Sequence, residues 1–264
     1  MLALYGWVGV VAGLAQAVYL VAAFVLAAHL LGRARRRRDL APFLLGLNLL
    51  FAMGFGYLLC SIGMAVAMFS PDPSPRLVAG LLGPGYAATI TGLSAALVFQ
   101  WRVFWPGARW PLALMGLFFA AMVGGWTGYL LSGGLATGRY EGVWVWLLYG
   151  GMLATNLWVG IEPLVYYAKL RKRVPLGLAD PLVADRFLLW GLGSLARAVM
   201  VVMGPAAVLA LELFDADTRI TFSAATLMTA STMGLAASLA YWLTFNPTPA
   251  YERWVERRYR TRPA

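Results

Sequence analysis

Seven long apolar runs divide this 264-residue chain, and only Glu162 and Arg197 bring a formal charge into them. The core of a bilayer is about 30 Å thick, so a helix needs about 20 apolar residues to cross it. Helices satisfy their own peptide groups, which lipid cannot do. The sequence therefore predicts an all-α, polytopic integral membrane protein with seven transmembrane helices, at roughly Trp7–Leu31, Pro42–Phe69, Leu77–Phe99, Pro111–Leu131, Val143–Ala168, Phe187–Leu211 and Ile220–Phe245.

The overall composition excludes the two main alternatives to a membrane protein. Charged residues make up 12% of the chain and hydrophobic residues 61%, whereas soluble domains carry about 25% charged residues. Disordered chains need low hydrophobicity, which this chain lacks. Small residues let membrane helices approach closely, so we expect close helix contacts at Gly54, Gly56, Gly124, Gly125 and Gly128.

Basic residues are distributed very unevenly between the predicted turns. Seventeen of the 21 lysines and arginines fall in the first, third and fifth turns and in the tail, at 33–38, 102–109, 169–186 and 253–262. Positive charge is retained on the cytoplasmic side of membranes, so this bias predicts an outside N-terminus and a cytoplasmic C-terminus in a bacterial inner membrane. We expect one seven-helix domain over 1–246 and a cytoplasmic tail over 247–264. The run of arginines is then explained by orientation, and no nucleic-acid partner is predicted.

Aromatic residues near the predicted span ends indicate contact with the membrane surface. In the tail, apolar and aromatic residues recur at helical spacing while charges occupy the other face, which predicts a short interfacial amphipathic helix that contacts anionic lipid. Tryptophan and tyrosine are enriched at headgroup level. The predicted membrane-interface residues are Trp101, Trp105, Trp110, Tyr251, Trp254 and Tyr259.

The two charges inside the spans are the main candidates for a functional site, because intramembrane charge is costly. Glu162 lies about 9 Å and Arg197 about 15 Å from the same side, if each helix rises 1.5 Å per residue. We therefore predict a Glu162–Arg197 ion pair, with Thr155 and Asn156 lining a polar cavity as part of a ligand or switch site. A purely structural pair, or an arginine extending alone to the surface, is the alternative. Pro163 is expected to kink the fifth helix as a hinge.

No cofactor is predicted. The single Cys60 excludes an internal disulfide and a CxxC metal site, and the single His29 excludes the usual multi-histidine zinc sites. In size and topology the chain resembles microbial rhodopsins, which hold retinal on a lysine of the seventh helix. The only lysines here, Lys169 and Lys172, lie in a predicted loop, so covalent retinal is excluded.

Two segments near the fifth predicted turn carry a second resemblance. The residues Val174–Pro181 (VPLGLADP) and Ala184–Gly191 (ADRFLLWG) resemble the fifth loop of uncharacterised seven-helix bacterial modules, some of which precede sensor histidine kinases. The tail Asn246–Val255 resembles their exit segment. The resemblance implies a sensor role. Because the chain ends at Ala264 without a kinase domain, a signal would pass to a separate partner.

These observations favour a non-enzymatic membrane protein of sensor or receptor type that acts on a separate cytoplasmic or membrane partner, or as a homo-oligomer. An accessory subunit of a larger inner-membrane complex is the first alternative, and a small transporter or permease subunit is the second. Transporters commonly contain inverted repeats, and an odd number of helices supplies none. An enzyme is not expected, because the HExxH and GxSxG motifs are missing.

Overall fold

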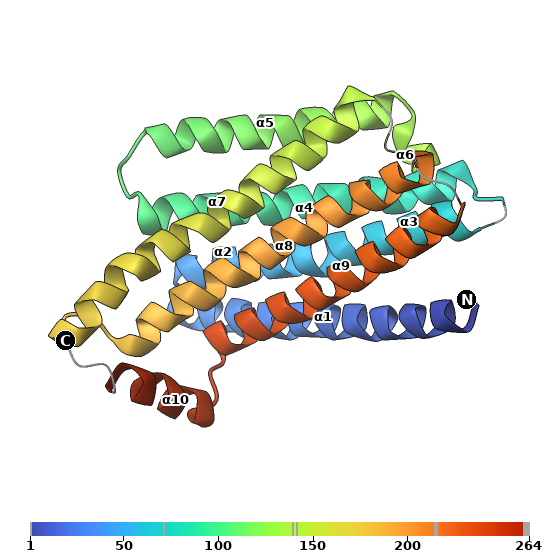
Figure 1. The fold of residues 1–264 in the computed structure, drawn as a ribbon. Coiled ribbons are helices and arrows are strands. Elements are labelled where there is room, and N and C mark those ends of the chain that lie inside the picture. The colour runs from blue at the N-terminus through green and yellow to red at the C-terminus, as the bar shows by residue number, and fades with distance from the viewer. Residues whose placement is uncertain (1, 71, 139, 141, 214–215, 261–264) are drawn as a thin grey trace.

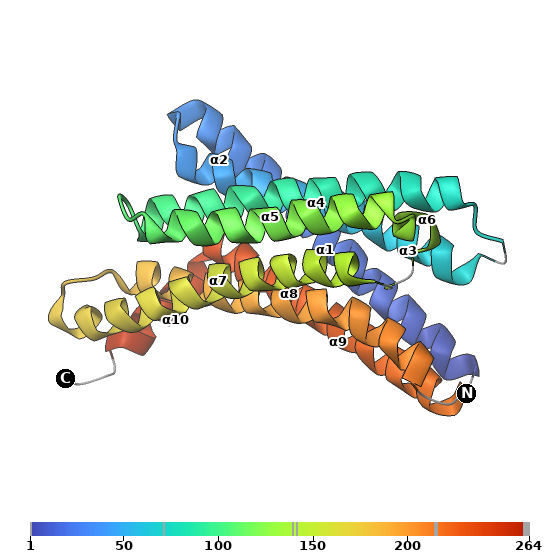
Figure 2. The ribbon, with the colours of Figure 1, turned by 90° about the horizontal axis from the view of Figure 1, so that it is seen from above.

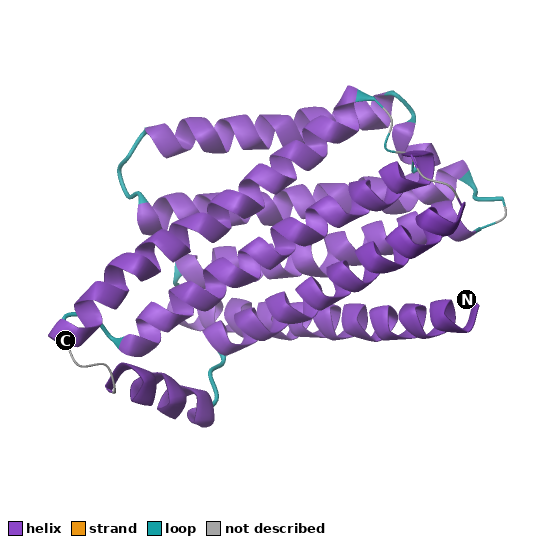
Figure 3. Cartoon of the chain, in the orientation of Figure 1, coloured by secondary structure: helices purple, strands orange, loops and turns teal. Residues whose placement is uncertain are grey.

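The computed structural model describes residues 2–70, 72–138, 140, 142–213 and 216–260. This part of the chain is almost entirely helical and contains no β-strand (Figure 3), which confirms the predicted all-α class. Its elements are α1 (Leu2–Arg37), α2 (Leu40–Leu47), η1 (Asn48–Gly56), α3 (Tyr57–Phe69), α4 (Pro75–Phe104), α5 (Trp110–Leu131), α6 (Gly134–Thr137), α7 (Val143–Arg173), η2 (Val174–Leu176), α8 (Pro181–Leu213), α9 (Ala216–Phe245) and α10 (Pro249–Arg260).

Seven helical segments are long and apolar enough to cross a bilayer, as the sequence predicted. The second of them is formed by α2, η1 and α3 in succession. Large apolar side chains cover the outside: Leu14 is 65% exposed and Leu117 is 61% exposed. Water-soluble monomers rarely expose apolar patches of this extent. The chain therefore has the architecture of a multi-pass membrane protein.

The spans form a closed ring in which neighbours in sequence pack together and the first span, α1, packs against the last, α9. Figure 2 shows α4 and α5 in one layer and α7, α8 and α9 in the other. α4 is the most buried span and contacts the second span on one side and α5 and α7 on the other. α5 is the least buried, because its outer face meets no other helix of the described chain.

Four of the five glycines expected at close helix contacts do lie there. A methyl group added to Gly125 would lie 2.4 Å from the backbone nitrogen of Leu148, and one added to Gly56 would lie 2.3 Å from the Thr89 hydroxyl. Gly54 and Gly128 meet aromatic rings in the same way. Gly124 does not, because it lies on the outward face of α5 with nothing within 4 Å of the added atom.

The middle of the second span is a π-helix, which the sequence did not predict. Over Asn48–Gly56 the backbone bonds run to the fifth residue along the chain rather than the fourth, which widens the helix. The widened segment packs closely on α4: an added methyl at Gly92 would lie 2.4 Å from the backbone nitrogen of Ala52. Such segments are often found at functional sites.

The turns that carry most of the basic residues gather at one end of the bundle. The α1–α2, α4–α5 and α7–α8 turns lie at the end where α9 passes into α10 (Figure 1). α1 begins at the opposite end. α1 and α7 extend through their basic last turns, to Arg37 and Arg173, because arginine and lysine favour a helix once it leaves the hydrocarbon.

Candidate functional site

The guanidinium of Arg197 is a buried charge in the middle of α8. The residue is 6% exposed, and its Nη1 donates a hydrogen bond of 3.0 Å to Oδ1 of Asn48. Asn48 is the first residue of η1, and its own Nδ2 donates to the carbonyl oxygen of Gly92 at 2.9 Å. Both ends of this amide are thus engaged, which fixes its orientation and links α8, η1 and α4.

Two buried tyrosines complete the surroundings of the guanidinium. Tyr19 of α1 and Tyr241 of α9 both interact with Arg197 through their hydroxyl groups. The Tyr241 hydroxyl also shares a hydrogen bond of 2.9 Å with Ser194, one turn before Arg197. The ring of Tyr19 packs edge-on against Tyr57 at 4.9 Å between centroids. We call Tyr19, Asn48, Ser194, Arg197 and Tyr241 the Arg197 centre.

The Arg197 centre balances a positive charge with neutral groups only. Among the side chains that the structure describes, no carboxylate oxygen lies within 4.0 Å of the Arg197 nitrogens. Removing a charge from water costs several kcal/mol, roughly, and attraction to an opposite charge usually offsets this cost. Here amide and hydroxyl dipoles supply the compensation instead. The Arg197 cation therefore has no fixed counter-charge among the described side chains.

The predicted Glu162–Arg197 ion pair is wrong. Glu162 is half-buried, and its Oε1 accepts a hydrogen bond of 3.4 Å from Trp158 Nε1 on its own helix. The face of α7 that meets α8 contains Gly160 and Leu164, which contact Leu195 and Gly191. Glu162 lies two residues from each of these, about 200° around the helix. The similar predicted depths of the two residues allow a pair, but Glu162 does not lie on the face of α7 that meets α8.

Thr155 and Asn156 do not join Arg197 either. Both are buried in α7, and each bonds to its own helix: Thr155 Oγ1 to the Gly151 oxygen and Asn156 Nδ2 to the Met152 oxygen, both at 2.8 Å. Such local bonds are the usual way in which polar side chains satisfy themselves inside a helix. Pro163 is buried, and α7 continues as a helix on both sides of it; its role as a hinge stays a prediction.

A second polar contact between spans involves Gln100, one residue beyond the predicted third span. Gln100 is fully buried in α4, and its Nε2 donates to the carbonyl oxygen of Trp158 at 3.3 Å. Its Oε1 has no hydrogen-bond partner within the described part of the chain. Trp158 in turn donates to Glu162, so these three residues connect α4 with α7 at a position separate from the Arg197 centre.

Three tyrosine hydroxyls form a chain at the opposite end of the bundle from α10. Tyr149 lies between Tyr86 at 3.0 Å and Tyr140 at 2.7 Å, oxygen to oxygen. The three residues come from α4, α7 and the segment after α6, and nothing in their sequence spacing indicated that they would meet. Together they hold this end of α4 and α7 in one position.

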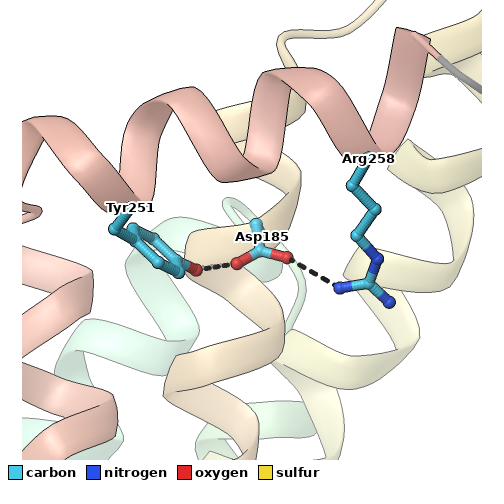
Figure 4. Close-up of polar contacts among 3 residues, drawn as sticks. All are labelled: Asp185, Tyr251 and Arg258. Atoms are coloured by element: carbon cyan, nitrogen blue, oxygen red, sulfur yellow. Dashed lines mark hydrogen bonds and ion pairs between the residues drawn. The ribbon is translucent and has the colours of Figure 1, made fainter.

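The tail helix α10 is docked on the bundle through Asp185, near the start of α8 (Figure 4). Asp185 is 2% exposed; it accepts a hydrogen bond from the Tyr251 hydroxyl and forms an ion pair with Arg258 at 3.7 Å between Oδ1 and Nη1. Val255, on the same face of α10, is fully buried. Burial and the neighbouring Tyr167 raise the pKa of Tyr259 to about 12, so its hydroxyl stays protonated at neutral pH.

The predicted interface residues divide into two groups in the structure. Trp105 and Trp110 meet edge-on at 4.8 Å at the α4–α5 turn, and the Trp101 indole donates to the Ala108 oxygen in the same turn. On α10, Trp254 is 49% exposed and lies under the Arg258 guanidinium. Tyr251, by contrast, is turned to Asp185 rather than away from the bundle. Contact of these residues with headgroups stays a prediction.

Comparison with known proteins adds nothing to this geometry, since no protein-family model, curated protein or solved structure matches the chain.

Proposed function

We propose that this chain is a non-enzymatic membrane protein of sensor or receptor type, in which a change at the Arg197 centre alters how α10 is held. The observation that carries the proposal is that α8 contains both Arg197 and Asp185. They are twelve residues apart, about 18 Å along one continuous helix. A helix transmits a shift or rotation of one end to the other, so α8 couples the buried cation to the tail helix.

The Arg197 centre is a suitable input because it joins four spans through groups that can rearrange. Tyr19, Asn48 and Tyr241 belong to α1, η1 and α9, and all three interact with the guanidinium. An anionic or strongly polar ligand near Arg197 would compete with these neutral partners. It would shift the packing by as much as its affinity differs between the two arrangements.

The proposed output is α10. It lies beside the basic turns, at the end of the bundle that the charge bias assigns to the cytoplasm. Arg253 and Arg257 lie on the exposed face of α10 while Val255 faces the bundle. Release of Asp185 would free the docked face of α10 for a separate partner. The proposed location is a bacterial inner membrane, with lipid as the surrounding solvent.

The test is a spin label on α10, at Arg253→Cys in a Cys60→Ala background, read by EPR in nanodiscs. We expect Asn48→Ala and Arg197→Met to change the mobility of the label, because both disturb the Arg197 centre. Thr155→Val is the matched control, since this buried hydroxyl bonds only its own helix. If the label responds to Asp185→Asn but to neither change at the Arg197 centre, α8 does not couple the two sites and the proposal fails.

One observation favours a second candidate, an accessory subunit or a homo-oligomer. Gly116, Ala120 and Gly124 recur every four residues on α5, and an atom added to Gly116 or Gly124 meets nothing within 4 Å. Small residues at this spacing promote close helix association in membranes. Native mass spectrometry distinguishes the two: a second chain or second copy that is lost in Gly116→Leu supports the subunit, and a monomer supports the receptor alone.

A further inference from the structure

An apolar groove of about 630 Å³ lies where the end of α1 meets the start of α2. The walls come from both helices and are aliphatic and aromatic, while charged residues stand at one end. Of the wall residues, Leu40 and Phe43 are almost half exposed. The lining residues are Leu31, Ala34, Leu40, Phe43 and Leu47 along the walls and Arg35, Arg38 and Asp39 at the mouth.

The groove crosses the level at which α1 changes from apolar to basic. The apolar run of α1 ends at Leu31, and the arginines begin two residues later. From Leu31 to Arg38 the helix rises about 10 Å. A bilayer passes from acyl chains to headgroups over a similar depth. One end of the groove is therefore at hydrocarbon level and the other at phosphate level.

The turn that forms the mouth has an unusual backbone. Arg38 has a φ of 51°, the one positive φ among the described residues other than glycine. The turn closes α1 by a bond from the Asp39 nitrogen to the Ala34 oxygen, at 3.3 Å. Glycine is the residue favoured in this position after a helix. An arginine here accepts backbone strain and brings a basic residue into the lining of the groove.

The one carboxylate at the mouth is already engaged. Asp39 Oδ1 accepts a hydrogen bond of 3.1 Å from the Ala41 nitrogen and caps α2. Neither Arg35 nor Arg38 forms an ion pair with a described side chain. The two guanidinium groups are thus available to an anion, and guanidinium binds phosphate through paired hydrogen bonds.

We propose that this groove binds one anionic phospholipid, with an acyl chain along the wall formed by Leu31, Phe43 and Leu47 and the phosphate at Arg35 and Arg38. The apolar length selects a lipid rather than free phosphate, and the arginine pair selects a net negative headgroup over a zwitterionic one. Basic clusters beside membrane helices attract anionic lipid in the same way. The inference does not depend on the receptor proposal.

The arginines of the same turn provide a matched control. Arg36 and Arg37 line a separate, polar pocket with His29 and Arg33 on another face of α1. The double variants Arg35→Gln/Arg38→Gln and Arg36→Gln/Arg37→Gln remove the same charge from the same turn. Only the first removes charge from the groove.

The experiment is native mass spectrometry of the full chain in detergent, with phosphatidylglycerol and phosphatidylcholine of identical acyl chains. We expect the unaltered chain to retain phosphatidylglycerol preferentially. One arginine near a membrane surface is worth about a five-fold change in affinity. The groove variant should therefore lose at least about five-fold in retention, while the control variant stays within about two-fold of the unaltered chain.

Three results would overturn the proposal. Equal losses in both double variants would mean that the charge acts diffusely, without a site. Equal retention of the two lipids would mean that the groove accepts acyl chains alone. Competition by free glycerol phosphate at the same concentration as the lipid would mean that the headgroup binds without the groove.

A single substitution separates lipid binding from folding. Arg38→Gly introduces the residue that the backbone favours, so thermal stability without added lipid should be unchanged or higher. Retention of phosphatidylglycerol should still fall by about five-fold, because the cation is gone. Full retention in Arg38→Gly would remove Arg38 from the site.

Discussion

Arg197 and Asp185 both lie on α8 and are almost equally buried, but other helices compensate their charges in different ways. Arg197 is held by neutral amide and hydroxyl groups from three other spans. Asp185 is held by an opposite charge, Arg258, and by the Tyr251 hydroxyl. Neutral partners do not cancel the positive charge of Arg197, so that charge can still attract a new anionic ligand. The ion pair with Arg258 neutralises the charge of Asp185. The difference separates a buried cation held by dipoles within the bundle from a buried carboxylate held by an ion pair at its end.

The largest effect is expected when the amide of Asn48 is removed and the charge of Arg197 is kept. Asn48→Ala should lower the free energy of unfolding by about 2–3 kcal/mol, because the buried guanidinium loses its amide partner and keeps only the two tyrosine hydroxyls. Arg197→Met should cost less, since an apolar side chain of similar size needs no partner. Unfolding in mixed micelles measures both, and the double variant should resemble Arg197→Met. Strict additivity would show that Asn48 does not compensate the charge.

A smaller, local effect is expected where Asp185 holds α10. Asp185→Asn should cost about 1–2 kcal/mol, because the partly exposed ion pair is lost while the Tyr251 hydroxyl keeps an acceptor. Hydrogen exchange should increase over 249–260 and stay unchanged in α8 beyond its first turns. Arg253→Gln, on the exposed face of α10, is the control. Protection that is the same in Asp185→Asn and in the control would mean that Val255 packing alone holds α10.

A single hydroxyl of the Arg197 centre should matter less than the amide. Tyr241→Phe removes the contact with Ser194 and with the guanidinium while keeping the ring, and we expect a loss of about 1 kcal/mol. Coupling to Arg197 is measured by a double-mutant cycle with Arg197→Met. A coupling energy near zero would restrict the centre to Asn48.

The smallest effect is expected at the other intramembrane charge. Glu162→Gln should change stability by less than about 0.5 kcal/mol and leave the α10 spin label unaltered, because Glu162 is half-buried and accepts a single long hydrogen bond. Thermal unfolding and EPR check the two statements. A large change in stability, or coupling between Glu162→Gln and Arg197→Met, would support the Glu162–Arg197 ion pair and contradict the structure.

The sequence determined the number of spans and the position of the turns, because apolar length and charge bias are properties of each segment alone. Contact between segments depends on which way each helix faces, and this was only partly predictable. Gly125 and Gly128 lie at helix contacts, as predicted. Gly124 belongs to the same helix but lies away from those contacts. For Glu162 and Arg197, depth along the helix axis follows from counting residues, whereas rotation about the axis depends on how the helices pack.

Other features had no signal that a single sequence could show. The π-helical backbone over Asn48–Gly56 consists mostly of ordinary apolar residues, and it packs closely against α4. Docking of α10 was missed because an amphipathic helix buries its apolar face equally well in headgroups or on another helix. Asp185 supplied the difference, and its burial was visible only once the bundle had formed.

The closed ring has a consequence for the making of this protein. Tyr19 lies in a span that leaves the ribosome before Arg197 and Tyr241 in one that leaves after it, yet both interact with one guanidinium. During insertion, Arg197 enters the bilayer while one of its neighbours has still to be synthesised. The centre is therefore complete only after α9 has been made, and until then the guanidinium lacks its Tyr241 partner.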